Sequence, residues 1–243
     1  MRIADGPAVV LLRQADETDD RYERALCERG FRARSVPVLS FRYPNQTALR
    51  ARLATPGRYA GLIVTSPRAV RAVAEAGEAS PTWADWTHKP TYAVGPKTAS
   101  ALRALGCHPS GQQAGRGAAL GAVIAKASNP YLFVCGNRRR DDLPNTLRQA
   151  GTPFEELVVY ETVLRSDLNL PSPAEGDWLV FFSPSGTQAV NSHAPEQMQG
   201  YRLAAIGPTT ADALRDLGLV PQAVASEPSP AALVAAVEQA THG

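Results

Sequence analysis

The chain has 243 residues, which at about 150 residues per domain predicts two domains rather than one or three. Apolar residues make up 44%, enough for a substantial core, and 25 basic against 23 acidic residues leave a net charge of only +2. This near balance argues against a protein whose main partner is a nucleic acid. It also argues against a charge-rich disordered chain.

Neither a membrane segment nor a metal site is expected. No stretch approaches the roughly 20 apolar residues of a membrane-spanning helix, and residues 1–6 lack the apolar core of a secretory signal. Cys27, Cys107 and Cys135 are odd in number and far apart, which is typical of the reducing cytoplasm. The histidines show no metal-ligand spacing and no CxxC pair occurs, so we expect a cytoplasmic protein without a metal.

Short β-branched runs alternate with helical patterns along the chain. The expected buried strands are 9–12, 61–65, 91–94, 131–134, 178–182 and 202–206. Most are followed by a turn marked by Gly, Pro or Ser and then by apolar residues at helical spacing. This alternation predicts an α/β fold with parallel sheets.

The two halves of the chain resemble each other in order. Residues 62–67 (LIVTSP) match 179–184 (LVFFSP), and 93–99 (AVGPKTA) match 205–211 (AIGPTTA). Each pair is separated by close to half the chain length. The repeat predicts two related α/β domains.

Two further β-rich segments, 35–39 and 156–162, follow helices that end at Gly30 and Gly151. We expect these segments to pair with each other. The chain would then leave the first domain along one segment and return along the other. Pro37 disfavours a central strand in the first of them.

Turns with polar residues or glycine follow the predicted strands in both halves. Ser66 and Ser183 each precede a proline that opens a helix, and Gly95 and Gly207 do the same. Because parallel strands end at the same edge of a sheet, these helix N-termini should face ligand crevices. They suit a ligand with several carboxylates or phosphates, although helix capping alone would also explain each turn.

Individual residues in and near these turns are candidates for substrate binding or catalysis. Arg13 follows the strand at 9–12 and three arginines, 138–140, follow the strand at 131–134, so Arg13 and one of the three are candidate carboxylate clamps. The other two fit a solvated surface. Cys135 is a candidate nucleophile, with a buried inert thiol as the commoner alternative. Tyr160 could donate a proton in the crevice or simply pack within a strand pair.

The ordered set of turns resembles the uroporphyrinogen-III synthase family. It consists of VLLR at 10–13, TSP at 65–67, VGPKTA at 94–99, CGN at 135–137, VYET at 159–162, FFSPSG at 181–186, IGPTTA at 206–211 and SEPS at 226–229. The resemblance implies two related doubly wound parallel-sheet α/β domains joined by a two-stranded β linker, with a cleft between them. Residues 1–37 plus 164–243 would form the first domain, and 38–163 the second with the linker strands.

The family reaction closes the linear tetrapyrrole hydroxymethylbilane to uroporphyrinogen III, with inversion of ring D and loss of water. The resemblance therefore implies a cofactor-independent lyase of porphyrin and heme biosynthesis, acting as a monomer on a small polycarboxylate substrate. Tyr160 matches the tyrosine proposed as the acid. The implied substrate-binding positions are Arg13, Ser66, Thr98, Gly136, Asn137, Arg140, Ser183, Ser185, Gly207, Thr209 and Thr210.

A second class of function fits the same residues. A non-catalytic two-domain binding or sensor module for an anionic small molecule would also need helix N-termini and arginines around a crevice. A nucleotide-dependent enzyme would need a glycine-rich phosphate loop, and none occurs.

Overall fold

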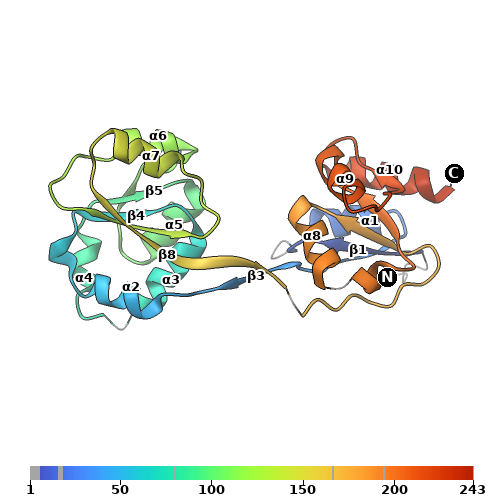
Figure 1. The fold of residues 1–243 in the computed structure, drawn as a ribbon, viewed down its shortest axis with the longest axis horizontal. Coiled ribbons are helices and arrows are strands. Elements are labelled where there is room, and N and C mark those ends of the chain that lie inside the picture. The colour runs from blue at the N-terminus through green and yellow to red at the C-terminus, as the bar shows by residue number, and fades with distance from the viewer. Residues whose placement is uncertain (1–5, 16–18, 79, 166, 194, 243) are drawn as a thin grey trace. The chain divides into compact units, whose positions relative to one another are not determined.

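The computed structural model describes residues 6–15, 19–78, 80–165, 167–193 and 195–242 (Figure 1). The chain divides into two compact units, Met1–Ser40 with Val163–Gly243 (unit 1) and Phe41–Thr162 (unit 2). It crosses between them in two strands, β3 (Leu39–Arg42) and β8 (Phe154–Leu164), which are neighbours in one sheet. From the sequence we expect these crossings at 37/38 and 163/164.

Both units alternate strands and helices. Unit 1 contains β1 (Ala8–Leu12), α1 (Arg21–Cys27), β2 (Arg32–Ser35), β9 (Trp178–Phe181), α8 (Pro184–His193), β10 (Arg202–Ala205), α9 (Pro208–Arg215), β11 (Ala223–Val224) and α10 (Pro230–His242). Unit 2 contains α2 (Gln46–Leu53), β4 (Gly61–Val64), α3 (Pro67–Gly77), α4 (Trp83–Thr87), β5 (Thr91–Ala93), α5 (Pro96–Ala104), β6 (Pro109–Ser110), α6 (Gly117–Val123), β7 (Tyr131–Gly136) and α7 (Asp142–Gln149).

The sheet of unit 1 has the strand order β11-β10-β9-β1-β2, and its neighbouring strands are parallel. Successive side chains of a strand point to opposite faces, so β1 supplies two cores. Val10 and Leu12 pack in a cluster that includes residues of α8 and α9. Val9 and Leu11 pack with residues of α1 and α10. Helices therefore cover both faces, which explains why β1 reads as a continuous apolar run.

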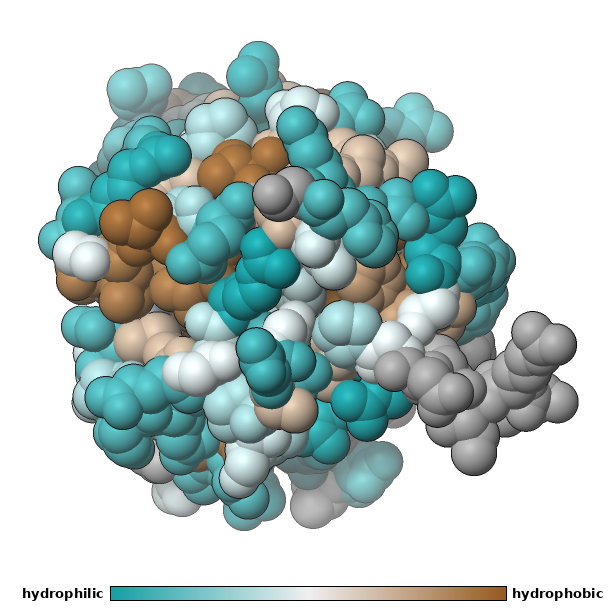
Figure 2. Space-filling view, turned by 90° about the vertical axis from the view of Figure 1, so that its right-hand side faces the viewer, coloured by the Kyte–Doolittle hydropathy of each residue, from teal (hydrophilic) through white to brown (hydrophobic). Residues whose placement is uncertain are grey.

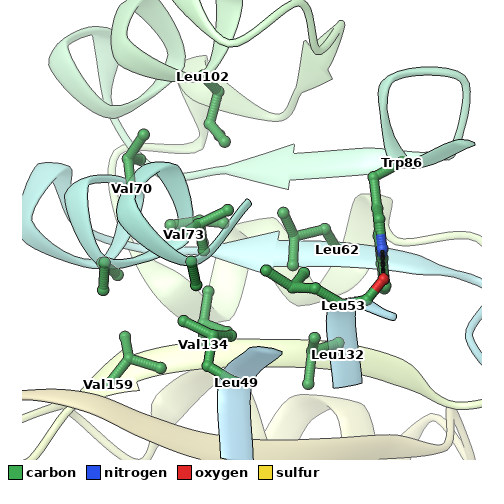
Figure 3. Packing of buried hydrophobic residues seen from close by; sticks show 14 of the residues in the cluster. Leu49, Leu53, Leu62, Val70, Val73, Trp86, Leu102, Leu132, Val134 and Val159 are labelled. Atoms are coloured by element: carbon green, nitrogen blue, oxygen red, sulfur yellow. Dashed lines mark hydrogen bonds between the residues drawn. The ribbon is translucent and has the colours of Figure 1, made fainter. Parts of the chain in front are cut away.

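The sheet of unit 2 has the order β3-β8-β7-β4-β5-β6, and β4 to β8 pair in parallel. One face carries a cluster in which Val70 and Val73 of α3 lie toward Leu62 of β4 (Figure 3). Trp86 of α4 closes that cluster and donates its indole N–H to the Leu53 carbonyl at 2.8 Å. Residues of α6 and α7 cover the opposite face. These two buried layers hold the strand ends of unit 2 in place.

Each sheet has a topological switch point. In unit 1 the chain order runs outward from β1 to β2 on one side and from β9 to β11 on the other. In unit 2 it runs from β4 to β6 on one side and from β7 to β8 on the other. Ligands of open α/β sheets bind at the carboxyl ends of the strands beside such a point. A ligand is therefore expected at the turns after β1 and β9 in unit 1 and after β4 and β7 in unit 2.

Several strand limits differ from the sequence-based expectation. The strands expected at 61–65, 91–94, 178–182 and 202–206 each end one residue earlier, whereas the strand expected at 131–134 continues to Gly136. The segment expected to pair at 35–39 contributes only Leu39 to β3, since Ser35 ends β2 and pairs with β1. The fixed φ and missing N–H of Pro37 account for the break between the two strands.

The surface of unit 1 that Figure 2 presents is largely hydrophilic, with hydrophobic side chains in separate patches. Among the described residues of this unit, the exposed large hydrophobic side chains are Leu217 and Val220. Scattered residues of this kind are normal on a protein surface. None of the helices in the described ranges is long and apolar enough to cross a membrane.

Candidate active site

A pocket of about 390 Å³ lies at the switch point of unit 2. Its walls come from the ends of four neighbouring strands and from residues at the starts of α6 and α7. The described lining residues are Thr65, Ser66, Val94, Gly115, Arg116, Gly117, Phe133, Gly136, Arg138, Arg139, Arg140, Leu143 and Tyr160. Four of the residues expected to form the site, Ser66, Gly136, Arg140 and Tyr160, are thus brought to one pocket although far apart in sequence.

Tyr160 enters this pocket from β8, whose neighbour is β7. The phenol ring is partly buried against the main core of unit 2, and it also lines the pocket. Its backbone carbonyl accepts a hydrogen bond from the Asn137 N–H at 3.1 Å. The ring of Tyr160 thus packs against the strands and also lines the pocket, so the two alternatives expected from the sequence are compatible.

The pocket is electropositive. Arg116, Arg138, Arg139 and Arg140 line it, and no acidic residue is among its described lining residues. The guanidinium of Arg139 donates to both carboxylate oxygens of Glu156, at 2.6 and 2.9 Å, and is also paired with Asp141. These hydrogen bonds, Glu156 first, raise the pKa of Arg139 above its ordinary value. Arg138 and Arg140 are exposed and take part in no ion pair with the described residues.

Cys135 is buried beneath the pocket and does not face it. Its thiol is 0% exposed and lies 3.6 Å from Glu156 Oε1. Burial, together with the neighbouring Glu156 carboxylate, raises the pKa of this thiol to about 12. A thiol that stays protonated and enclosed is a poor nucleophile. The inert alternative is therefore the one that the geometry supports.

Ser66 and Thr98 stand at the starts of α3 and α5. The Ser66 hydroxyl accepts a hydrogen bond from the Ala69 N–H at 3.2 Å, so it caps α3 as its sequence context predicts. It also lines the pocket. The side chain of Thr98 is 3% exposed, so a substrate contact from this residue would have to come from its backbone.

Asn137 lies at the rim of the same region, just after β7. Its side-chain oxygen accepts the Thr162 N–H at 3.0 Å, and its own N–H donates to Tyr160. Both hydrogen bonds are made with the main chain of β8, and neither group points into the pocket. Asn137 itself is exposed and is not among the described lining residues.

In unit 1, Arg13 follows β1 at the switch point. Its guanidinium donates to both oxygens of the Asp20 carboxylate at 2.8 and 2.6 Å, and it lies 5.0 Å from the ring centroid of Tyr22 and 5.4 Å from that of Phe182. Asp20 also accepts the N–H groups that begin α1. Arg13 is thus engaged within its own unit, and a substrate carboxylate would have to share it.

The other expected residues of unit 1 lie in the turns after β9 and β10. Ser183 accepts the Gly186 N–H at 3.1 Å, and its hydroxyl lies 3.1 Å from that of Ser185. Gly207 precedes α9, where Thr209 is exposed while Thr210 is buried, with 4% exposure. All of these residues stand at the carboxyl ends of parallel strands, as the pattern of the turns predicts.

Two charged residues in or beside the unit 2 pocket were not predicted from the sequence. Arg116 lines the pocket immediately before α6, far from any predicted strand, so no sequence pattern marked it. Glu156 neutralises Arg139 from β8, a pairing that only the register of β7 and β8 reveals. Among the described residues, no group of three or more His, Cys, Asp or Glu side chains could hold a metal ion.

A family model described as uroporphyrinogen-III synthase HemD matches residues 20–235. The chain belongs to the uroporphyrinogen-III synthase family. The uroporphyrinogen-III synthase of Saccharomyces cerevisiae is 30% identical over 95% of this chain and 95% of its own length. That of Schizosaccharomyces pombe is 29% identical over 94% and 95%. The resemblance seen in the ordered turns is therefore confirmed.

Solved structures agree with the fold. The uroporphyrinogen-III synthetase of Helicobacter pylori has a TM-score of 0.62 at 22% identity, covering 96% of this chain and 99% of its own. A mutant uroporphyrinogen III synthase of Thermus thermophilus has a TM-score of 0.54 at 20% identity, covering 98% and 99%. The predicted α/β class with parallel sheets is confirmed.

Proposed function

We propose that this chain closes hydroxymethylbilane to uroporphyrinogen III, with inversion of ring D and loss of water, in porphyrin and heme biosynthesis. Family membership supports the reaction. The observation that carries the site is the unit 2 pocket, which Tyr160 lines together with Arg138 and Arg140, two arginines that form no ion pair with the described residues. A proton donor and two positive charges at one switch point suit a substrate that is a polycarboxylate with a leaving hydroxyl.

The positive charges hold the substrate. Every pyrrole ring of the linear tetrapyrrole carries carboxylate side chains, and guanidinium groups bind carboxylates through paired hydrogen bonds. The helix N-termini at Ser66, Ser183, Gly95 and Gly207 add backbone N–H groups. Because the spontaneous reaction closes the chain at the wrong carbon, holding one conformation is the larger part of catalysis.

Tyr160 supplies the acid. Departure of the substrate hydroxyl as water needs a proton, and a phenol can donate one within hydrogen-bond reach. The resulting electrophilic azafulvene is attacked by ring D at its substituted carbon, and the spiro intermediate then fragments and recloses with loss of a proton, which returns to the Tyr160 oxygen. The carboxylates of the substrate itself and the Tyr160 phenolate, rather than the arginines, offset the positive charge on the pyrroles.

We further infer that the chain acts as a monomer in the cytoplasm and that its partner is the small substrate rather than a nucleic acid. Its cysteines, Cys27, Cys107 and Cys135, are free thiols, as suits a reducing compartment. The net charge of +2 lacks the large basic excess of nucleic-acid-binding proteins.

The function is tested by an assay with freshly generated hydroxymethylbilane, followed by chromatographic separation of the type I and type III isomers. We expect the type III isomer in the presence of the chain and the type I isomer in its absence. If only the type I isomer forms in both, the proposed reaction is wrong. Tight substrate binding in that case would favour the alternative, a non-catalytic binding module.

A further inference from the structure

The ring of Tyr160 lies directly against the backbone of Gly136. A Cβ atom built on Gly136 would stand 2.3 Å from Tyr160 Cζ, 2.6 Å from its hydroxyl oxygen and 2.7 Å from Cε2. All three distances are far below an ordinary carbon contact of about 3.5 Å. Any side chain at position 136 would therefore push the ring away from its present place.

The backbone of Gly136 does not itself require glycine. Gly136 does not have the left-handed backbone conformation, with positive φ, that Gly95 and Gly151 have. An alanine could adopt its backbone conformation without strain. Contact with the Tyr160 ring is thus the reason that a side chain does not fit here.

A β-bulge places the two residues opposite each other. Cys135 pairs with Val158, but the next residue of β7, Gly136, pairs with Tyr160, so β8 holds one extra residue at this point. Bulges re-aim side chains and are common near active sites. Here the bulge turns Tyr160 onto the strand end that lines the pocket.

Polar contacts hold the bulged segment from both sides. The Asn137 N–H and side-chain oxygen bind the Tyr160 carbonyl and the Thr162 N–H. On the other side, the Asn45 side-chain amide donates to the Val158 carbonyl at 2.9 Å. The main chain of β8 is thereby fixed just before and just after Tyr160, which leaves the ring as the part free to respond to a change at Gly136.

We propose that Gly136 is a positioning residue, whose missing side chain lets the Tyr160 ring lie on β7 and so sets where the phenol projects into the pocket. Asn137 assists by holding the main chain of Tyr160. The proposal rests on the proposed function, since it assigns the acid to Tyr160. It moves Gly136 and Asn137 from the set of expected substrate-binding residues to residues that act through Tyr160.

The test is a double-mutant cycle on the full chain, in which kcat and KM are measured for formation of the type III isomer. Gly136→Ala should lower kcat by about 100-fold and change KM by less than about threefold, because a displacement of about 1 Å removes the acid from its productive place. In a Tyr160→Phe background the same change should lower kcat by less than about threefold further, since the hydroxyl is already absent.

Gly77→Ala is the matched control. Its added Cβ would lie 2.9 Å from Trp83 Cε3 at the end of α3, and neither residue is among the described pocket lining. It tests whether a buried clash alone lowers activity, and we expect kcat to stay within about threefold of the unsubstituted chain. Asn137→Ala adds no clash, so it serves if Gly136→Ala does not fold. Its loss of kcat should likewise disappear in the Tyr160→Phe background.

Two results would overturn the proposal. One is a loss from Gly136→Ala, or from Asn137→Ala if it is the variant used, that is equally large with and without the Tyr160 hydroxyl. The other is a rise in KM with unchanged kcat, which would assign the position to substrate binding. Formation of the type III isomer by the unsubstituted chain in the same assay would show that only the positioning role has failed. If that isomer does not form, the proposed function fails as well.

Discussion

Three consecutive arginines in one turn have different surroundings. Arg139 is held by Glu156 and Asp141, whereas Arg138 and Arg140 line the pocket with no ion pair to the described residues. A guanidinium already bound to two carboxylates has few N–H groups left to bind a third. The two arginines without such a pair are therefore the ones to which we assign the substrate carboxylates.

Replacement of either arginine should weaken substrate binding. We expect Arg138→Ala and Arg140→Ala each to raise KM by about tenfold, the value of one charge-assisted hydrogen bond, with kcat changed by less than about threefold. Steady-state kinetics with hydroxymethylbilane measures both quantities. Arg50→Ala, an exposed arginine on α2 outside the described pocket lining, is the matched control. Unchanged KM in both pocket variants would remove these arginines from the site.

At the scale of the element, β8 has two roles along its length. Near its start, Glu155 accepts hydrogen bonds from Arg52 at 2.5 Å, Arg58 at 3.0 Å and the Tyr59 hydroxyl at 2.9 Å. These contacts tie β8 to the helix and turn before β4. Near its end, the bulge presents Tyr160 to the pocket. We therefore expect stability to depend on Glu155 and activity to depend on Tyr160, two residues of the same strand.

Glu155→Gln should therefore destabilise unit 2 without touching the pocket. We expect a loss of about 2 kcal/mol in the free energy of unfolding, because charged hydrogen bonds to a partly buried group are lost. Glu75→Gln is the control, since its pair with Arg71 is exposed and should contribute much less to stability. Chemical denaturation of the two variants measures both losses, and equal effects would contradict the role of Glu155.

The lowered pKa of Glu155 predicts that the stability of the fold depends on pH. Burial acts to raise the pKa of Glu155, but the hydrogen bonds from Tyr59 and Arg52 and the nearby positive charges outweigh it, so the pKa lies below the ordinary 4.5. A carboxyl with a lowered folded pKa stabilises the fold above its ordinary pKa, and this stabilisation is lost as the pH falls through the folded value. The difference in unfolding free energy between the chain and Glu155→Gln should accordingly shrink below pH 4.5.

The elements that could be predicted from the sequence are those with strong local signals. The central strands are apolar on both faces, and the Ser-Pro and Gly-Pro turns mark where their helices begin. The edge strands β2 and β11 lack that signal, because β2 reads RARS and β11 has only two residues. Tyr160 was predicted through its place in a motif. Its contact with Gly136 depends on a bulge, and no local pattern encodes the register of two strands.

At the scale of the molecule, two units of similar architecture place their polar turns at the carboxyl ends of parallel strands. The net charge of +2 is compatible with a polyanionic substrate, because arginines and backbone N–H groups act locally at these turns. In the proposed mechanism many groups hold the substrate, whereas Tyr160 alone supplies the proton. The identity of the isomer formed then tests how the substrate is held, and the rate of its formation tests the acid.

The most direct measurement compares the unsubstituted chain with Tyr160→Phe under single-turnover conditions, with the protein in excess over hydroxymethylbilane and the enzyme-free reaction subtracted. The rate of type III formation should fall by about 100-fold in the variant, because the acid is lost. The enzyme-dependent product should remain the type III isomer, and the variant should unfold at nearly the same temperature. A variant that forms the type III isomer at the full rate would contradict the assignment of the acid to Tyr160.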